Sequence, residues 1–170
     1  EDCKREIESV AQHAKATRDS GFLLTEQGGN PDPMLDSARA AMEEVRGALN
    51  AGNPGAAEAG LQTIRKLGNE ARDAIDAQVA ARDSCAARIE EFERLIKEHA
   101  TSVARATECR ESLERDYAQA SWENVAGNLR LAEEATAQFE PLFEQAKSAS
   151  GGDSQCYFHA LALLDNAGEH

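Results

Sequence analysis

Aromatic residues are scarce in this chain of 170 residues, which holds five Phe, two Tyr and one Trp. Valine, isoleucine and threonine never gather into the alternating runs that are typical of strands. A core made largely of Ala, Leu and Ile suits close-packed helices, whereas a sheet would be enriched in β-branched and aromatic residues. These absences predict an all-α fold.

Positive charge is also in short supply, because 31 Asp and Glu outnumber 18 Lys and Arg and the formal net charge is −13. Binding to nucleic acid or to an anionic membrane surface requires clustered Lys and Arg. We therefore expect neither partner. The main interpretation of the acidity is a solvated helical surface, and the alternative is a basic partner or loosely associated divalent cations.

No apolar run reaches the ~18 residues of a transmembrane helix, so we expect no direct membrane insertion. The chain also lacks a Gly-rich phosphate loop, a Gly-x-Ser-x-Gly elbow, an HExxH motif and an EF-hand loop. No Glu is followed by His three residues later, as a di-iron bundle would require. We therefore expect no enzymatic activity, no cofactor and no metal site.

The chain does contain a repeated apolar skeleton, offset by 82 residues. Both copies advance alternately by four and three residues, which places the skeleton on one helical face that packs against neighbours. The first copy is Cys3, Ile7, Val10, Ala14, Thr17, Gly21 and Leu24, and the second is Cys85, Ile89, Phe92, Ile96, His99, Val103 and Ala106. The repeat predicts tandem helical units, each opened by a cysteine.

Glycine and proline divide the first unit into three expected helices. A first helix over residues 2–25 should end in the Gly- and Pro-rich segment 26–33. A second helix is expected over residues 34–50. Asn53 could cap a third helix that starts at Pro54.

The junction between the two units lacks a helix breaker over residues 75–89, although Gln78 and Arg82 make the apolar seam polar there. Two interpretations fit this pattern. One is a single long helix that crosses between bundles, as in spectrin-type arrays, and the other is a short turn near residues 82–84. We favour the continuous helix, extending to about Ala106, because no breaker is present.

The rest of the second unit is expected to be more interrupted. A turn near Thr107 should lead into a shorter helix over residues 109–120, and Ser121 should cap the next helix. Pro141 lies inside that helix and should kink or split it. A Gly- and Ser-rich linker, residues 148–153, then precedes a last helix.

These boundaries predict a first helical unit over residues 1–82 and a second over residues 83–150. Residues 151–170 would either begin a third unit or form a C-terminal helix that packs on the second. The expected architecture is therefore a set of tandem antiparallel three-helix, spectrin-like units or one elongated helical bundle, stabilised by disulfides.

Four cysteines without a Cys-x-x-Cys motif predict disulfides and an oxidising compartment. Cys109 and Cys156 would fall at the same end of an up-down-up bundle and are the expected pair. Cys85 and Cys109 bracket one helix that holds them ~36 Å apart, too far for a disulfide. Cys3 and Cys85 remain: they could pair if the bundle folds back, bond to partners outside the chain, or be buried free thiols.

The most apolar stretch contains Tyr157, Phe158, Leu161 and Leu164. In the favoured interpretation these side chains complete the core of the second unit. In the alternative they form an exposed contact surface for a partner.

Together these features predict a non-enzymatic secreted or periplasmic module, and therefore an extracytoplasmic one, that binds a protein partner or acts as a scaffold. The alternative is the extracytoplasmic ligand-sensing bundle of a membrane receptor. A sensor requires a pocket between helices with a few convergent polar groups. A scaffold should instead show a filled core and an exposed groove or helix face.

Overall fold

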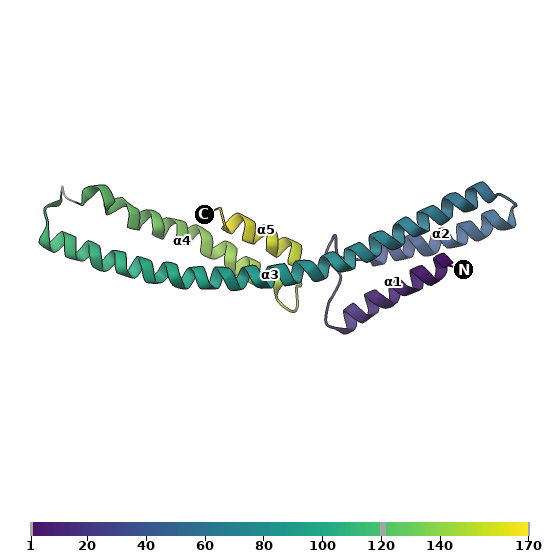
Figure 1. Cartoon of the computed structure of the whole chain (residues 1–170), viewed down its shortest axis with the longest axis horizontal. Helices are drawn as coiled ribbons and strands as arrows, with labels where there is room; N and C mark the ends of the chain where they lie inside the picture. The colour runs from purple at the N-terminus through teal and green to yellow at the C-terminus, as the bar shows by residue number, and fades with distance from the viewer. Residues whose placement is uncertain (1, 120–121, 170) are drawn as a thin grey trace. The chain divides into compact units, whose positions relative to one another are not determined.

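The computed structural model of the chain describes residues 2–119 and 122–169. No strand occurs in these residues, and the all-α prediction is confirmed. The helices are α1 (Asp2–Asp19), α2 (Asp32–Asn50), α3 (Pro54–Asp116), α4 (Glu123–Ser150) and α5 (Tyr157–Ala167) (Figure 1).

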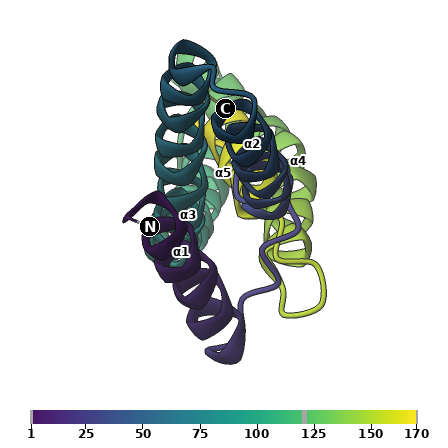
Figure 2. The same cartoon turned by 90° about the vertical axis from the view of Figure 1, so that its right-hand side faces the viewer.

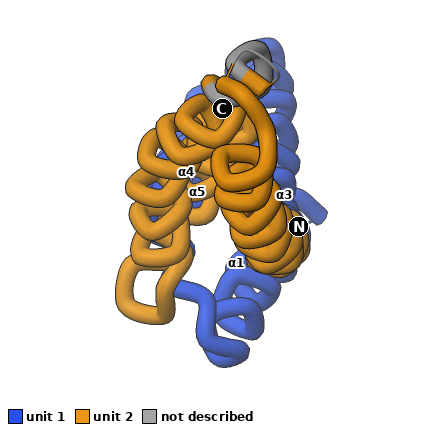
Figure 3. Tube along the Cα trace, turned by 90° about the vertical axis from the view of Figure 1, so that its left-hand side faces the viewer, with its two compact units in different colours: residues 1–81 blue, residues 82–170 orange. Residues whose placement is uncertain are grey.

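The helices group into two compact units, residues 1–81 and residues 82–170 (Figure 3). Unit 1 contains α1, α2 and the first part of α3, which lie side by side (Figure 2). Unit 2 contains the remainder of α3 together with α4 and α5. The boundary between the units therefore falls inside α3.

α1 ends at Asp19, earlier than the predicted end at Thr25. Gly21 has a φ of 100°, and the amide of Phe22 donates a hydrogen bond to the carbonyl of Thr17. A glycine in the left-handed region with this bond forms a Schellman motif, which satisfies the last carbonyls of a helix. The longer prediction is wrong because Gly21 terminates the helix instead of continuing its apolar face.

α3 begins as predicted. Pro54 is its first residue, and the Asn53 side-chain oxygen accepts a hydrogen bond from the amide of Ala56 at 3.1 Å. Asparagine is a favoured cap because this bond satisfies one of the free amides of the first turn. Proline suits the first turn because its missing N–H would have had no partner there.

The continuous helix across the junction is confirmed, and α3 extends 63 residues to Asp116. The predicted turn near Thr107 and the separate helix over residues 109–120 are wrong. The Thr107 hydroxyl donates to the carbonyl of Val103 at 2.9 Å, a bond that a threonine can make inside a helix. Polar residues alone did not break this helix, because none of them removes a backbone hydrogen bond.

α4 is not split at Pro141, which lies within it. A proline removes one backbone donor and leaves the carbonyl four residues earlier without its helical partner. Both Pro141 and Ala137 are exposed, so water can reach that carbonyl. The predicted cap at Ser121 lies outside the described residues.

Unit 1 has a core to which all three of its helices contribute. Two side chains of the α1–α2 loop, Phe22 and Leu24, are buried as well. Burying an aliphatic or aromatic side chain of this size contributes roughly 1.5–3 kcal/mol. The buried helical residues include Ile7, Val10 and Ala14 of α1, Leu35, Ala38 and Val45 of α2, and Ile64, Ala71 and Ile75 of α3.

Unit 2 is held together at one end by α5. This helix packs on α4, and its Asp165 forms an ion pair with Arg88 of α3. Phe92 of α3 meets Phe139 of α4 edge-on at 5.4 Å between ring centroids, and Phe139 stacks on Phe143 at the same distance. Aromatic pairs in these geometries contribute about 0.5–1.5 kcal/mol beyond their buried area.

Candidate interaction surface

All four cysteines are free thiols in this structure, which gives the predicted Cys109–Cys156 disulfide no support. Cys109 lies beside Leu129 near the start of α4. The amide of Cys156 donates to the carbonyl of Ala149 at the other end of α4, at 2.8 Å. Leu129 and Ala149 are ~30 Å apart along the helix, whereas a disulfide requires Cα atoms within roughly 7 Å. The two cysteines lie far apart because α3 continues past Cys109 without a turn.

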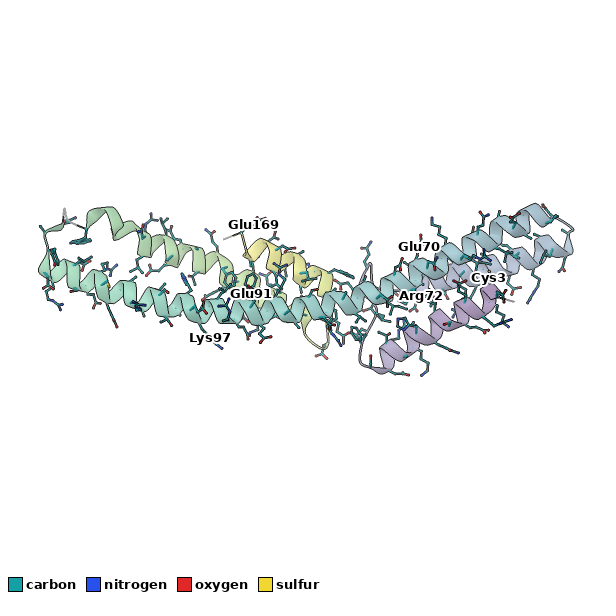
Figure 4. The ribbon with its side chains drawn as sticks, in the orientation of Figure 1. Cys3, Glu70, Arg72, Glu91, Lys97 and Glu169 are labelled. Atoms are coloured by element: carbon teal, nitrogen blue, oxygen red, sulfur yellow. The ribbon has the colours of Figure 1, made fainter. Side chains whose placement is uncertain are left out.

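Cys3 and Cys85 are buried, with 8% and 1% of their surfaces exposed. Cys3 lies in the first turn of α1 (Figure 4). The structure has no disulfide between Cys3 and Cys85. They agree with the third alternative, small apolar core residues. Disulfide stabilisation therefore has no support in the structure.

The four apolar residues near the C-terminus do not form an exposed contact surface. Tyr157 and Leu164 are buried, with 7% and 0% exposure, and Phe158 and Leu161 are half-buried. The favoured interpretation, completion of the core of the second unit, agrees with this burial.

An apolar groove of about 240 Å³ begins where α5 ends. Ala167 and Gly168 close it at one end. Its walls are Leu95, Ile96 and His99 from α3 and Ala135, Thr136 and Phe139 from α4. The groove is thus the continuation of the surface that α5 covers on the α3–α4 pair.

A second groove of about 220 Å³ lies further along the same two helices. It is lined by Ala106, Cys109, Arg110 and Leu113 of α3, Asn128 and Leu129 of α4, and Trp122 before α4. The Arg110 guanidinium forms an ion pair with Glu114 of the same helix at 3.5 Å. Heptad spacing keeps residues on one face of a packed helix pair. Ala106 and Leu113 follow His99 at intervals of seven, and Asn128 precedes Ala135 by seven, so both grooves lie on one face.

We call this face the uncovered strip. In the part of the chain that the structure describes, no third helix lies over it beyond α5. Leu95 is 40% exposed, and Leu131, one helical turn from Ala135, is 55% exposed. The strip is defined by Leu95, His99, Ala106 and Leu113 of α3 and by Asn128, Leu131, Ala135 and Phe139 of α4.

The main polar contact in the first groove joins His99 and Thr136. His99 Nε2 lies 3.0 Å from Thr136 Oγ1, whose hydroxyl donates to the Ala132 carbonyl at 2.8 Å. With the hydroxyl proton used in that bond, Oγ1 accepts from His99 in the tautomer that places the ring proton on Nε2. This arrangement is a hydrogen bond that joins α3 to α4.

A lysine on α4 forms an ion-pair cluster with two carboxylates. Lys147 Nζ lies 3.1 Å from Glu93 of α3, 3.8 Å from Glu144, and 5.3 Å from the centre of the Phe143 ring. The hydrogen bond that Lys147 donates to Glu93, followed by the negative charge of Glu144, raises the pKa of Lys147 above its ordinary value. The cluster links α3 to α4 and is structural.

The described residues hold no group of three or more His, Cys, Asp or Glu that could bind a metal ion. Among them, no helix is both long enough and apolar enough to cross a bilayer. No family model, curated protein or solved structure matches this chain. The uncovered strip is therefore the feature of the described residues that bears most directly on function.

The sequence contained part of the signal for this surface. Ile96 and His99 belong to the repeated skeleton, and they do lie between α3 and its neighbours. The skeleton shows which face of α3 is apolar but not how far a covering helix extends. The strip could not be predicted because the sequence does not show that α5 ends too early to cover residues 95–113.

Proposed function

We propose that this chain is a non-enzymatic helical module that binds a protein partner through the uncovered strip of unit 2. The observation that carries the proposal is a pair of mainly apolar grooves, aligned on one face of α3 and α4, that no described helix covers. Contiguous exposed apolar surface on a protein commonly marks an interaction site. As part of this proposal, the two units are tandem three-helix units of spectrin type that share α3.

The chemistry of the strip favours a protein over a small molecule. A ligand-sensing pocket usually encloses its ligand and offers several polar groups that converge on it. Here the polar pair His99 and Thr136 is already joined by a hydrogen bond, and the remaining walls are mostly apolar. A long, open, apolar face fits an extended partner better than a compact ligand.

Photo-crosslinking tests this proposal. A photoreactive amino acid would replace Leu131 in the full chain, expressed in its native cells. Leu49 of unit 1 is the matched control because it is a similarly exposed leucine, at 61% against 55%. We expect irradiation to yield a discrete heavier adduct from position 131 and none from position 49. Absence of an adduct at 131, or equal adducts at both positions, would overturn the proposal.

We propose the extracytoplasmic location separately. Its support is the even number of cysteines with no reactive Cys-x-x-Cys motif. The free thiols described above give it no further support. Fractionation of native cells tests it: we expect the protein in the secreted or periplasmic fraction, and recovery with cytoplasmic markers would refute this location.

A further inference from the structure

We infer that the partner of the uncovered strip is an amphipathic α-helix with basic flanks. It would lie along α3 and α4 in line with α5, beyond the C-terminal end of that helix. This inference rests on the proposed function and specifies its ligand. It follows from three properties of unit 2: the direction of α5, the length of the strip and the charge around it.

α5 runs in the same direction as α3. Its Asp165 pairs with Arg88, and Gly168 lies next to the ring of Phe92, so later residues of α5 meet later residues of α3. α4 runs the opposite way, because Lys147 meets Glu93 near the start of this segment and Thr136 meets His99 further along. α5 is thus the third helix of a bundle, and it stops beside Phe92.

The strip continues this third-helix position. From Phe92 to Leu113, α3 rises about 32 Å, a length that a helix of roughly 20 residues would cover. Small residues alternate with large ones along it, since Ala106 and Ala135 lie between Leu95, Phe139 and Leu113. Such a surface accepts the apolar face of an incoming helix, whose larger side chains fill the spaces above the alanines.

The negative charge of unit 2 favours basic residues on the flanks of the partner helix. Residues 82–170 contain 17 Asp and Glu against 9 Lys and Arg. Glu140 lines the first groove, and Glu91, labelled in Figure 4, lies one turn before Leu95 on α3. In the described part of the chain neither carboxylate has an ion-pair partner. Lys or Arg beside the apolar face of the partner would supply one.

A second copy of this chain fits the strip less well. Two copies would bring together two units with the same surplus of carboxylates, and like charges across an interface are unfavourable. A helix with acidic flanks meets the same repulsion. Complementary charge therefore favours a basic helix, and self-association is left as an outcome that the experiment can detect.

The test uses designed peptides and the whole chain. One peptide of about 20 residues carries a heptad stripe of Leu and Ala flanked by Lys and Arg, and its twin carries Glu at the same flanking positions. Neither contains Trp, so the single Trp of the chain, Trp122, reports binding because it lines the second groove. We expect the basic peptide to change Trp122 emission saturably and to bind at least about tenfold more tightly than the acidic twin. Added salt should reduce that difference.

Variants locate the binding site. Leu95→Asp should weaken binding of the basic peptide about tenfold or more, because it places a charge without a partner in the apolar face. Leu49→Asp is the matched control on unit 1 and should leave binding unchanged. Leu95→Ala, which keeps the surface apolar, should weaken binding less. Circular dichroism establishes that each variant remains helical.

Several results would overturn the inference. Equal binding of both peptides would show that basic flanks are not required. Binding that Leu95→Asp does not affect would show that the peptide binds outside the strip. A dimer of the chain in sedimentation that Leu95→Asp dissociates would identify a second copy as the occupant. If position 131 yields a crosslinked protein but the basic peptide does not bind, the proposed function stands and this inference fails. If neither occurs, both fail.

Discussion

In unit 1, α1 and α2 have nearly the same length, 18 and 19 residues, whereas in unit 2 α5 has 11 residues against the 28 of α4. The two copies of the apolar skeleton reflect this difference. In α1 the skeleton from Cys3 to Thr17 is buried throughout. In α3 it begins with buried Cys85, passes through half-buried Phe92 and reaches exposed His99.

The comparison shows that one residue pattern can have two uses. An apolar face at helical spacing indicates that a helix packs, but the length of its neighbours decides how much of the face is covered. Unit 1 covers its α1 skeleton with its own helices. Unit 2 covers only the first turns of its skeleton and leaves the later turns partly exposed.

The largest expected difference concerns side-chain truncation at the two ends of unit 2. Leu164→Ala removes a side chain with 0% exposure and should lower the free energy of unfolding by about 2–5 kcal/mol. Val103→Ala on the half-buried part of α3 should cost less than about 1 kcal/mol. Amide hydrogen exchange of α4 measures both. A similar cost at both sites would mean that the strip is covered after all.

Thiol labelling compares the same two ends without changing the fold. Cys85 is 1% exposed under the covered end, whereas Cys109 lies exposed in the second groove. We expect Cys109 to react with a thiol reagent on the order of a hundredfold faster, because Cys85 must wait for local opening. Mass mapping of the labelled sites gives both rates. Equal rates would contradict the difference in coverage, and a mass that shows a disulfide would restore the predicted pairing.

Replacing glycine by alanine should change stability in opposite directions at two positions. A Cβ on Gly60 of α3 would lie 2.4 Å from Val45 Cγ2 of α2, so Gly60→Ala should destabilise unit 1 by about 1 kcal/mol net. Gly127 of α4 has no heavy atom within 4 Å of that position, so Gly127→Ala should stabilise unit 2 by about 0.5–1 kcal/mol. Hydrogen exchange of each unit measures the two effects. Two stabilising results would show that α2 and α3 do not approach this closely.

The smallest expected effect concerns Lys147. Its pKa is raised in the folded chain, so its stabilising contribution is present at neutral pH and is lost as the pH rises through that elevated pKa. Lys147→Gln should therefore lower the stability of unit 2 slightly at pH 7 and have no effect at strongly alkaline pH. Lys66→Gln, at an exposed pair with Glu70 in unit 1, is the control and should have less effect at pH 7. An effect of Lys147→Gln that does not vary with pH would exclude the charge as its cause.

Much of the secondary structure could be predicted because its determinants are local. The cap at Asn53 and the absence of a breaker over residues 75–89 located the start and the continuity of α3. The end of α1 was misplaced because Gly21 fits an apolar periodicity and a helix terminus equally well. Only the conformation at φ 100° distinguishes the two.

The candidate site was harder to predict because it depends on distances between segments remote in the sequence. The Cys109–Cys156 pairing depends on a helix that ends near Thr107. Because α3 continues past this point, the two cysteines lie beside positions of α4 that are ~30 Å apart. Likewise, the exposure of Leu95 depends on where α5 stops beside it. Neither fact is encoded in the residues that surround these side chains.

The boundary inside α3 has a consequence for protease digestion. Residues 81 and 82 are neighbours in one unbroken helix, so a protease finds no extended segment at the point where the two units divide. Cleavage should occur in the α1–α2 connection and between α4 and α5 before it occurs there. The two units share the helix α3. Expressing them as separate chains divided at this boundary would create two new helix ends with unsatisfied amides and carbonyls.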